Sequence, residues 1–462
     1  MNDPANSSVR SLAVSLSGGG HRATLFVLGA LMYLVDAKAN AHVTSIASVS
    51  GGSLTNGFVG QTVNFREIDS SEFRKRVASP LATQIAKSGT LFAPLFTKVY
   101  LLVLGAAGLL VLIIPAIRPV PWYLRVLLFF IGLAGWGWLF GVRGRVCARA
   151  FGSTLFSPDG RQTTLDQVKK PDLDHVICST ELRAAEQVYF SGDFVYSYAL
   201  GYGEPAKLFL ARAVQASAAF PGGFPPATLP TQPHKFKGAP PPDAGGPPSP
   251  PTAMVLTDGG VYDNMGDQWA RGFAARIKRC PNLGPGRTPP NQLVVVNASA
   301  RIPWIPFRQK LIPLIGEVAA LLRVNNILYI NTTNVRRQSI VASFDPTNPL
   351  TASALPSALV QISQSPFAVA SAFAHGTTPV AERAQRVLDF LAKGPTSDDW
   401  AAIARENSAV ATTLSKLGTE VSARLIYQGY VVTMCNLQVL FGTDFPLVPD
   451  TLAIERFRDL IT

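Results

Sequence analysis

The stretch "SVSGGS", Ser48 to Ser53, places Ser50 between small residues, where an apolar run ends and a helix is expected to begin. A nucleophile elbow has the pattern Gly-x-Ser-x-Gly, which turns the chain sharply and exposes the serine Oγ. Gly52 supplies the second glycine of this pattern, and Ser48 replaces the first. A serine that caps a helix fits the same letters. The stretch therefore predicts either a nucleophile or a capping serine.

Three consecutive glycines, Gly18 to Gly20, follow another strand-like run and open the next expected helix. Helix N-termini carry unpaired N–H groups and positive potential, and glycine lets an anion approach them closely. Such a loop binds a phosphate or stabilises an oxyanion, and Arg22 adds positive charge. A nucleotide-binding loop is disfavoured, because neither Gly-Lys-Ser/Thr nor an acidic residue ending the second strand is present. A turn that serves only packing is the remaining alternative.

A nucleophilic serine needs a base. None of the five histidines stands in a sequence context that marks it as that base. Asp258, in "LTDGGVYDNMG", ends an apolar strand-like run and precedes two glycines. A carboxylate accepts a serine proton when it is held close and partly desolvated. Asp258 is therefore the candidate base, and an aspartate in a plain turn is the alternative.

Short apolar runs alternate with helical stretches through much of the chain. Strands are expected at Ser11–Ser17, His42–Ser50, Asp172–Leu182, Val188–Gly192, Ala253–Gly260 and Gln292–Ser299. This order predicts an α/β fold with a mostly parallel sheet flanked by helices. Because the carboxyl ends of parallel strands gather at one edge, we expect Ser50, the glycine loop and Asp258 to converge there.

The segment Val99–Val142 is far more apolar than the rest of the chain. Val99–Ile117 would form a helix about 28 Å long, close to the thickness of a bilayer core. Trp122–Val142 is a second such span, after a turn at Arg118–Pro121. Basic residues flank the two outer ends: Lys87, Lys98, Arg143, Arg145 and Arg149. We expect a transmembrane helical hairpin with the bulk of the protein in the cytoplasm, at the inner or plasma membrane. A buried core hairpin and a re-entrant anchor are the alternatives.

The composition also favours a membrane. Of the 462 residues, 47% are hydrophobic and only 15% are charged, against a usual share of about 25% charged residues. A net charge of +12 suits the anionic face of a membrane. Nucleic acid is not expected as a partner, because long basic runs and zinc-finger spacings do not occur. Four scattered cysteines without a C-x-x-C pair argue against a zinc site or a disulfide framework.

Four blocks in order give the chain a family resemblance: Ser17–Arg22, Ser48–Ser53, Ala211–Pro226 and Thr257–Gly266. Together they resemble the patatin-like phospholipase family, in a membrane-anchored form of bacterial type. The resemblance extends to about Ala300, with the hairpin and a Pro/Gly-rich loop at 237–252 as insertions. It implies a patatin-like catalytic domain built from 1–98 and 143–300, interrupted by the hairpin at 99–142. A mainly helical C-terminal region, 301–462, follows.

The family hydrolyses acyl esters with a Ser–Asp dyad and without a catalytic histidine. Carried over residue by residue, the resemblance implies Ser50 as the nucleophile and Asp258 as the base. It assigns the oxyanion hole to Gly18, Gly19, Gly20 and Arg22, and the support of the elbow to Ser48, Gly51 and Gly52. It implies neither a metal nor a cofactor. The chain departs from the usual pattern at Ser48 and at Ala23, where glycine is common.

The resemblance thus implies a membrane-associated serine lipid acyl hydrolase, a carboxylic ester hydrolase of the phospholipase or lysophospholipase kind. Its expected partners are the bilayer and a phospholipid or other acyl-ester lipid. Two alternatives keep the same fold: an acyltransferase or transacylase using the same dyad, and a catalytically silent membrane scaffold. The sequence indicates neither the lipid, the acyl position nor the oligomeric state. The segment Phe307–Val324 is amphipathic enough to touch a membrane, although core packing is the favoured interpretation of most segments of this kind.

Overall fold

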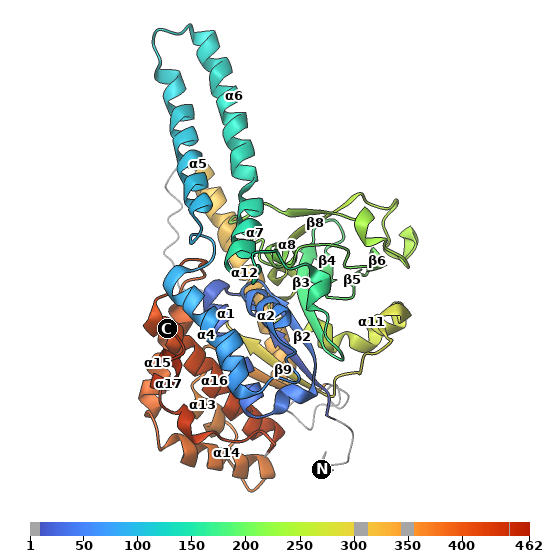
Figure 1. The fold of residues 1–462 in the computed structure, drawn as a ribbon, viewed down its shortest axis with the longest axis vertical. Helices are drawn as coiled ribbons and strands as arrows, with labels where there is room; N and C mark the ends of the chain where they lie inside the picture. The colour runs from blue at the N-terminus through green and yellow to red at the C-terminus, as the bar shows by residue number, and fades with distance from the viewer. Residues whose placement is uncertain (1–9, 300–312, 343–354, 443) are drawn as a thin grey trace.

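The protein is built around one mixed sheet of ten strands (Figure 1). The computed structural model describes residues 10–299, 313–342, 355–442 and 444–462. The strand order is β10-β9-β1-β2-β3-β4-β5-β6, with β8 paired to β3 and β7 paired to β8. The strands are β1 Leu12–Leu16, β2 Val43–Val49, β3 Asp174–Glu181, β4 Glu186–Phe190, β5 Val195–Ser197, β6 Gly201–Gly203, β7 Ala227–Pro230, β8 Ala253–Asp258, β9 Gln292–Asn297 and β10 Ser357–Gln361.

The expected α/β class is confirmed, but the sheet is mixed rather than mostly parallel. Strands β10, β9, β1, β2 and β3 run parallel to one another. Strands β4 and β8 pair antiparallel with β3, and the pairs β4–β5, β5–β6 and β7–β8 are also antiparallel. Short turns link β3 through β6 and reverse the chain each time, while parallel neighbours need long crossovers. Strands β7 and β8 are the arms on either side of the Pro/Gly-rich segment 237–252, which contains one short 3₁₀ turn.

Helices cover the sheet and continue through the C-terminal region. They are α1 Gly20–Asp36, α2 Gly51–Thr62, α3 Ser70–Phe73, α4 Ser79–Thr83, α5 Leu95–Ile113, α6 Trp122–Gly141, α7 Arg143–Thr154, α8 Leu210–Ser217, α9 Gly260–Asp263, α10 Gln268–Arg271, α11 Phe273–Arg279, α12 Pro313–Ala342, α13 Pro366–Ser371, α14 Pro379–Leu391, α15 Ser397–Ala409, α16 Thr419–Phe441 and α17 Glu455–Arg458. Helix α1 is buried along nearly its whole length, as expected of a helix between the sheet and a further layer.

The C-terminal region packs onto the N-terminal part of the chain through α16, which lies against α1 (Figure 1). The two helices touch where each carries a glycine. A Cβ at Gly29 would lie 2.0 Å from the carbonyl oxygen of Ile426, and one at Gly429 would lie 2.0 Å from that of Phe26. Neither glycine tolerates a side chain, so the backbones approach as closely as sterics allow. The C-terminal region is therefore part of the core and not a loosely attached module.

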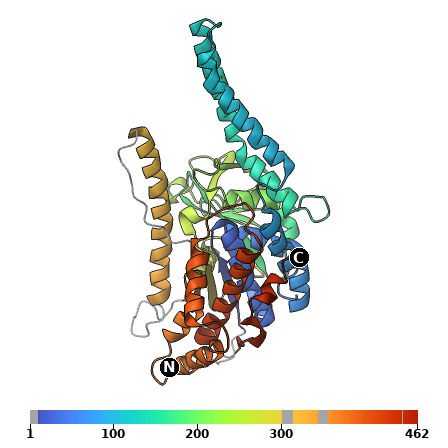
Figure 2. The same ribbon diagram turned by 90° about the vertical axis from the view of Figure 1, so that its left-hand side faces the viewer.

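The C-terminal region is mainly helical, as predicted, but it also adds β10 to the sheet beside β9. Helix α12 stands apart from the other C-terminal helices at one side of the molecule (Figure 2). The amphipathic segment expected at Phe307–Val324 falls partly outside the described residues. Its described part begins α12.

Helices α5 and α6 form a hairpin that projects away from the sheet (Figures 1 and 2). Both are long and apolar enough to cross a membrane by length and composition. Most of their large apolar side chains are exposed, for example Leu102 at 72% and Leu112 at 74%. The arms are joined by polar contacts, such as the hydrogen bond of 3.1 Å from Trp136 Nε1 to the carbonyl oxygen of Leu104. The hairpin therefore exposes an apolar surface that soluble proteins bury.

Candidate active site

Ser50 and Asp258 are brought together by two strands that end against each other on β3. Val49, the last residue of β2, pairs with Cys178, and Asp258, the last residue of β8, pairs with the next residue, Ser179. The other edge of β3 is occupied by β4, so β2 and β8 share one edge of β3 end to end. Ser50, the glycine loop and Asp258 do converge, as expected. Asp258 does not reach this place as the end of a parallel strand, however, because β8 is antiparallel to β3.

The backbone of Ser50 is that of a strained turn and not of an ordinary capping residue. Its φ of 50° and ψ of −116° lie in a region that residues other than glycine seldom adopt, and its side chain makes no capping hydrogen bond. Such conformations cost on the order of 1–3 kcal/mol and persist when surrounding contacts enforce them. Here the Ser50 N–H donates to Ser217 Oγ at 2.9 Å. This geometry fits the elbow alternative and not the capping alternative.

Asp258 is almost inaccessible to solvent, with 2% of its surface exposed. Its carboxylate accepts hydrogen bonds from the Gly260 N–H, at 2.8 Å, and from the Ser50 hydroxyl. Burial raises the pKa of Asp258 to about 7, and these two hydrogen bonds act in the opposite direction. A carboxyl with a pKa near neutrality is suited to taking up and returning a proton at that pH.

The glycine loop lies beside Ser50, and its three N–H groups differ in whether a described residue already accepts a hydrogen bond from them. The Gly18 N–H donates to the Asn264 carbonyl oxygen at 3.1 Å, so it is not available to an oxyanion. Gly19 has φ 143° and Gly20 has φ 59°, and among the described residues nothing accepts a hydrogen bond from either N–H. A Cβ at Gly18 would lie 3.2 Å from that of Ser50. Of the three glycines expected to form the oxyanion hole, only Gly19 and Gly20 have an N–H group that no described residue occupies.

Arg22 is buried beneath this loop. Its Nε donates to the Ala298 carbonyl oxygen at 2.9 Å, and its Nη1 donates to that of Val410. Burial lowers the pKa of Arg22 to about 10, which leaves it charged at neutral pH. The guanidinium thus ties the loop to the end of β9 and to the C-terminal region. Its hydrogen bonds fit support of the loop better than direct contact with an oxyanion.

The small residues around the elbow are required by close backbone contacts. A Cβ at Gly51 would lie 2.1 Å from the Gly20 carbonyl oxygen, and one at Gly52 would lie 2.7 Å from that of Leu16. Both distances are too short for any side chain to be added without moving the backbone. The elbow and the glycine loop therefore fit together only when both positions are glycine.

Ser48, which stands where the elbow glycine is usual, is fully buried and fully hydrogen-bonded. Its hydroxyl donates to the Val176 carbonyl oxygen at 3.1 Å and accepts from Ser53 Oγ at 3.1 Å and from Asn56 Nδ2 at 2.9 Å. A buried hydroxyl costs little when its partners are present. The extra oxygen is thus accommodated in a polar network on the inner side of the turn, away from the cavity.

The structure describes all five histidines, and none lines the cavity at Ser50. His21 is hydrogen-bonded to the Ser415 carbonyl oxygen and to Thr90 Oγ1, and burial lowers its pKa to about 4. His175 is bonded to Asn56 Oδ1 at 2.8 Å, and burial lowers its pKa to about 3. Both are neutral structural groups, so no histidine lies at the cavity as an alternative to Asp258 among the residues that the structure describes.

A cavity of about 640 Å³ opens beside Ser50 and Asp258. This volume is typical of ligand pockets. Apolar side chains form much of its wall: Leu54, Leu91, Phe92, Phe220, Phe224, Ile330 and Leu414. Part of the wall comes from the C-terminal region, through Arg323, Tyr329 and Ile330 on α12 and through Thr412 to Leu414. Sequence reasoning missed these residues, since no motif marks them and they lie far along the chain from Ser50.

Comparison with known families shows to which family the chain belongs. A family model described as patatin-like phospholipase matches residues 14–266, more than half of the chain. The chain belongs to the patatin-like phospholipase family. The matched residues include Ser50, the glycine loop and Asp258, and they run through the α5–α6 hairpin. Helices α12 and α16, by contrast, lie entirely beyond the part of the chain that the patatin model matches.

Two further comparisons add little to the patatin assignment. No curated protein sequence matches the chain. Among solved structures, the chain is similar to VipD from Legionella pneumophila at 11% sequence identity. The match covers 99% of this chain and 92% of VipD, with a TM-score of 0.28.

Proposed function

We propose that the protein is a membrane-associated serine hydrolase that cleaves acyl esters of phospholipids or lysophospholipids. The observation that carries this proposal is the contact between Ser50, held in a strained turn, and the buried carboxyl of Asp258. Membership of the patatin-like phospholipase family supports a lipid acyl hydrolase in general.

In the proposed mechanism one carboxylate accepts and returns a proton twice, once in acylation and once in hydrolysis of the acyl-enzyme. Ser50 Oγ attacks the ester carbonyl carbon while its proton passes to Asp258. The Gly19 and Gly20 N–H groups hold the oxyanion that develops on the carbonyl oxygen. The C–O bond to the alcohol then breaks, and Asp258 returns the proton to the departing oxygen. Water, activated by Asp258, releases the fatty acid from the acyl-enzyme and regenerates Ser50.

The apolar cavity and the hairpin fit a substrate that comes from a bilayer. The cavity wall includes Phe92, three residues before α5 begins, so the pocket lies close to the base of the hairpin. An acyl chain needs an apolar cavity, and the aromatic and aliphatic lining provides it. With α5 and α6 across the membrane, the rest of the protein would face the cytoplasm, as the flanking basic residues favour. The net charge of +12 favours anionic headgroups nearby.

A fluorophosphonate probe, which reacts with activated serines, tests the nucleophile directly. Wild type in detergent would be compared with Ser50→Ala, Asp258→Asn and the control Ser153→Ala, which removes a serine hydroxyl on α7 that bonds only within its helix. We expect labelling of wild type and of the control, and none of the two dyad variants. Labelling that survives in Ser50→Ala would overturn the assignment of the nucleophile.

The same preparations would then be given vesicles of phosphatidylglycerol and phosphatidylcholine, and lysophospholipid micelles. Release of free fatty acid by wild type and not by Ser50→Ala supports the hydrolase. Transfer of the acyl group to added glycerol or lysophospholipid, with little free fatty acid, would instead identify an acyltransferase. A folded wild type that neither labels nor releases acyl groups would favour the catalytically silent scaffold.

A further inference from the structure

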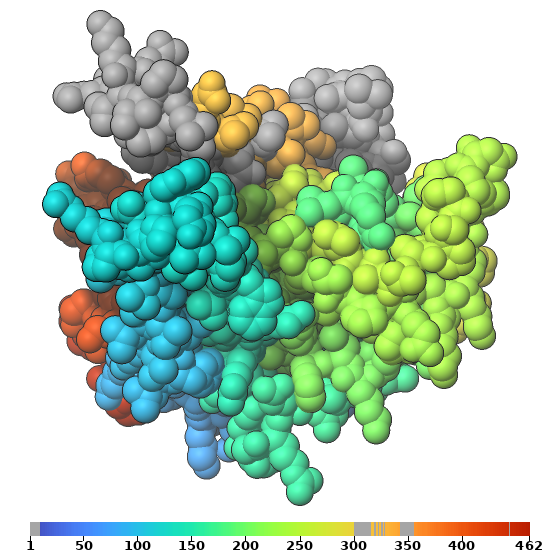
Figure 3. All heavy atoms as spheres, turned by 90° about the horizontal axis from the view of Figure 1, so that it is seen from above, coloured from blue at the N-terminus to red at the C-terminus, as the bar shows by residue number. Residues whose placement is uncertain are grey.

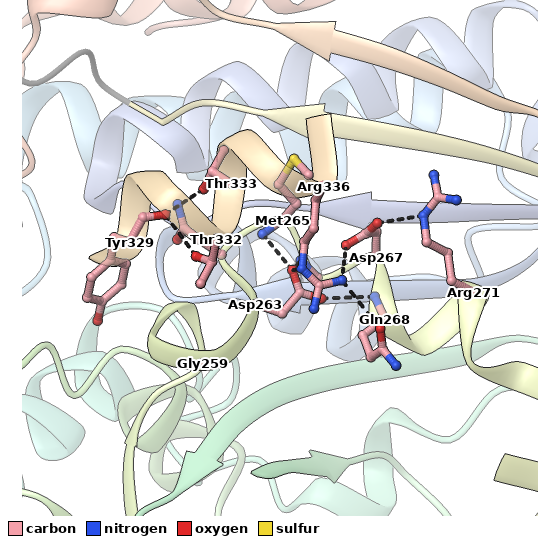
Figure 4. Close-up of polar contacts among 12 residues, drawn as sticks. Gly259, Asp263, Met265, Asp267, Gln268, Arg271, Tyr329, Thr332, Thr333 and Arg336 are labelled. Carbon is pink, nitrogen blue, oxygen red and sulfur yellow. Dashed lines mark hydrogen bonds and ion pairs between the residues drawn. The ribbon is translucent and has the colours of Figure 1, made fainter. Parts of the chain in front are cut away.

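Helix α12 supplies part of the cavity wall from outside the family-matched residues, and it is fixed in place by buried charges. Arg336 Nη1 lies 2.9 Å from Asp267 Oδ1, and its Nε lies 3.5 Å from Asp263 Oδ1. Both carboxylates are fully buried, and Arg271 holds Asp267 from the other side at 2.6 Å. Figure 4 shows Arg336 pointing from α12 into this cluster. The position of α12 is thus set by ion pairs to the segment that follows Asp258.

Tyr329 lies about two turns before Arg336 on the same helix, so the ion pairs also position its ring (Figure 4). The Tyr329 ring contacts Phe220, with centroids 5.8 Å apart. It also lies against Gly260, where an added Cβ would come within 2.6 Å of Tyr329 Cε1. Gly260 is the residue whose N–H bonds to the Asp258 carboxylate. The ring therefore packs on the Asp258 side of the cavity.

The Tyr329 hydroxyl is buried and has no hydrogen-bond partner among the described residues. Buried polar groups in native structures nearly always have a partner, and an orphan calls for an explanation. Tyr329 lines the cavity beside Ser50 and Asp258. Burial, together with the charge of Asp258, raises the pKa of Tyr329 above its usual value, so the hydroxyl keeps its proton and acts as a donor. A ligand bound in the cavity is the group that can accept a hydrogen bond from the Tyr329 hydroxyl.

We propose that Tyr329 contacts the substrate and donates a hydrogen bond to the alkoxy oxygen of the scissile ester. This inference rests on the proposed function. The departing alcohol must receive its proton from Asp258, so its oxygen has to lie on the side of the cavity where Tyr329 stands. The carbonyl oxygen lies instead at the glycine loop, which approaches Ser50 from a different element. Tyr329 thus assists departure of the alcohol, while Gly19 and Gly20 stabilise the oxyanion.

The proton balance leaves Tyr329 unchanged. Formation of the bond from Ser50 Oγ to the carbonyl carbon moves one proton to Asp258. Cleavage of the carbon–alkoxy bond moves that proton from Asp258 to the alkoxy oxygen. The Tyr329 hydroxyl hydrogen-bonds to this oxygen as negative charge grows on it, without transferring its own proton. The contribution should therefore be large for a basic alcohol that leaves poorly and small for an acidic phenol that leaves easily.

Tyr329→Phe, which removes only the hydroxyl, tests this inference against two substrates. On a lysophospholipid, whose alcohol is a poor leaving group, we expect kcat/KM to fall by about tenfold or more. On p-nitrophenyl butyrate, and in labelling by the fluorophosphonate, we expect the rate to change by less than about twofold. Tyr262→Phe, which alters a part-exposed tyrosine outside the cavity lining, is the matched control and should leave both rates unchanged.

Stability gives an independent readout for the same variant. Removing a buried hydroxyl that has no partner should leave the melting temperature of Tyr329→Phe equal to or above that of wild type. Equal losses on both substrates would mean that Tyr329 only supports the structure, and no loss on either would mean that it does not touch the ester. Both results overturn the inference while wild-type activity stands. A wild type that neither labels nor hydrolyses would overturn the proposed function and this inference with it.

Discussion

Ser50 and Asp258 are hydrogen-bonded at a place where the carboxyl is almost closed off from water. The contact exists because β2 and β8 end against each other on one edge of β3. Exclusion of water has two consequences that can be separated. It raises the pKa of Asp258 towards the range in which a base works at neutral pH, and it makes the ionised carboxylate costly for the folded state.

The first consequence predicts how the activity depends on pH. Asp258 acts as a base only when ionised, and its pKa of about 7 means that the active fraction grows as the pH rises through neutrality. We expect kcat/KM on a lysophospholipid to rise about tenfold per pH unit below the pKa and to level off above it. The measurement is an initial-rate series from pH 5 to 9, with folding checked at each pH. A profile that stays flat through pH 6 to 8 would contradict Asp258 as the base.

The second consequence predicts that Asp258→Asn stabilises the protein at high pH. The carboxyl has an ordinary pKa of 3.8 when unfolded and one of about 7 when folded, so wild-type stability falls as the pH rises between these values and stays lower above them. A shift of this size corresponds to about 4 kcal/mol at most. Asparagine does not titrate. The melting temperature of Asp258→Asn should therefore exceed that of wild type at pH 8, and the difference should shrink towards pH 4.5.

That stability difference has an internal control. Asp263, whose pKa burial also raises to about 7, is present in both proteins, so its contribution cancels when the two melting curves are subtracted. A constant difference across the whole pH range would show that the variant acts through packing and not through the ionisation of Asp258.

The strained backbone of Ser50 predicts a difference between two inactive variants. Ser50→Ala and Ser50→Gly both remove the nucleophile, but only glycine adopts φ 50°, ψ −116° without strain. Relief of this strain should make Ser50→Gly more stable than Ser50→Ala by about 1–2 kcal/mol. Thermal unfolding in the same detergent measures this difference. Equal stability of the two variants would mean that the turn is relaxed in solution.

Much of the fold was predictable because its central strands are continuous apolar runs. The runs that form β1, β2, β3, β4, β8 and β9 all lie within or close to the ranges expected from the sequence. Strands β5 and β6 were missed because each has three residues, and Gly201–Gly203 contains no apolar alternation. Strand β10 was missed because its five residues stand in a region with a helical pattern. Strand direction was not predictable either, since the pairing of β8 depends on partners far away in the chain.

Some features of the candidate site can likewise be predicted from local sequence, whereas others depend on residues far away in the chain. Ser50, Gly19, Gly20 and Asp258 were predicted as site residues because each stands at or just after the end of a recognisable strand and beside glycines. The bond from the Gly18 N–H to Asn264 joins residues 246 positions apart, so no local pattern could show that this donor is occupied. The cavity wall formed by α12 depends in the same way on tertiary packing. Local turns can be recognised in a sequence, whereas the hydrogen-bond partners of backbone groups and the residues that line a cavity cannot.

The ion pairs of Arg336 predict that a single substitution at this residue loosens the packing of α12. Arg336→Met keeps an unbranched side chain and removes the charge, which leaves the fully buried Asp263 without a cation among the described residues. Breaking a buried pair in this way costs about 3–5 kcal/mol, and the remaining contact from Arg271 to Asp267 should keep the loss at the lower end. Loosening of α12 should also slow lysophospholipid hydrolysis, because Tyr329 is then no longer held against the cavity.

The pH dependence of this loss identifies its cause. Without Arg336 the pKa of Asp263 should rise further, so Asp263 stays protonated in the folded state while it ionises in the unfolded one. The melting temperature of Arg336→Met should therefore fall below that of wild type by more at pH 8 than at pH 5. Arg337→Met, at the neighbouring exposed position of α12, is the matched control and should change stability little at either pH. If both variants lose stability equally, or if the loss does not depend on pH, the buried ion pairs do not hold α12 in place.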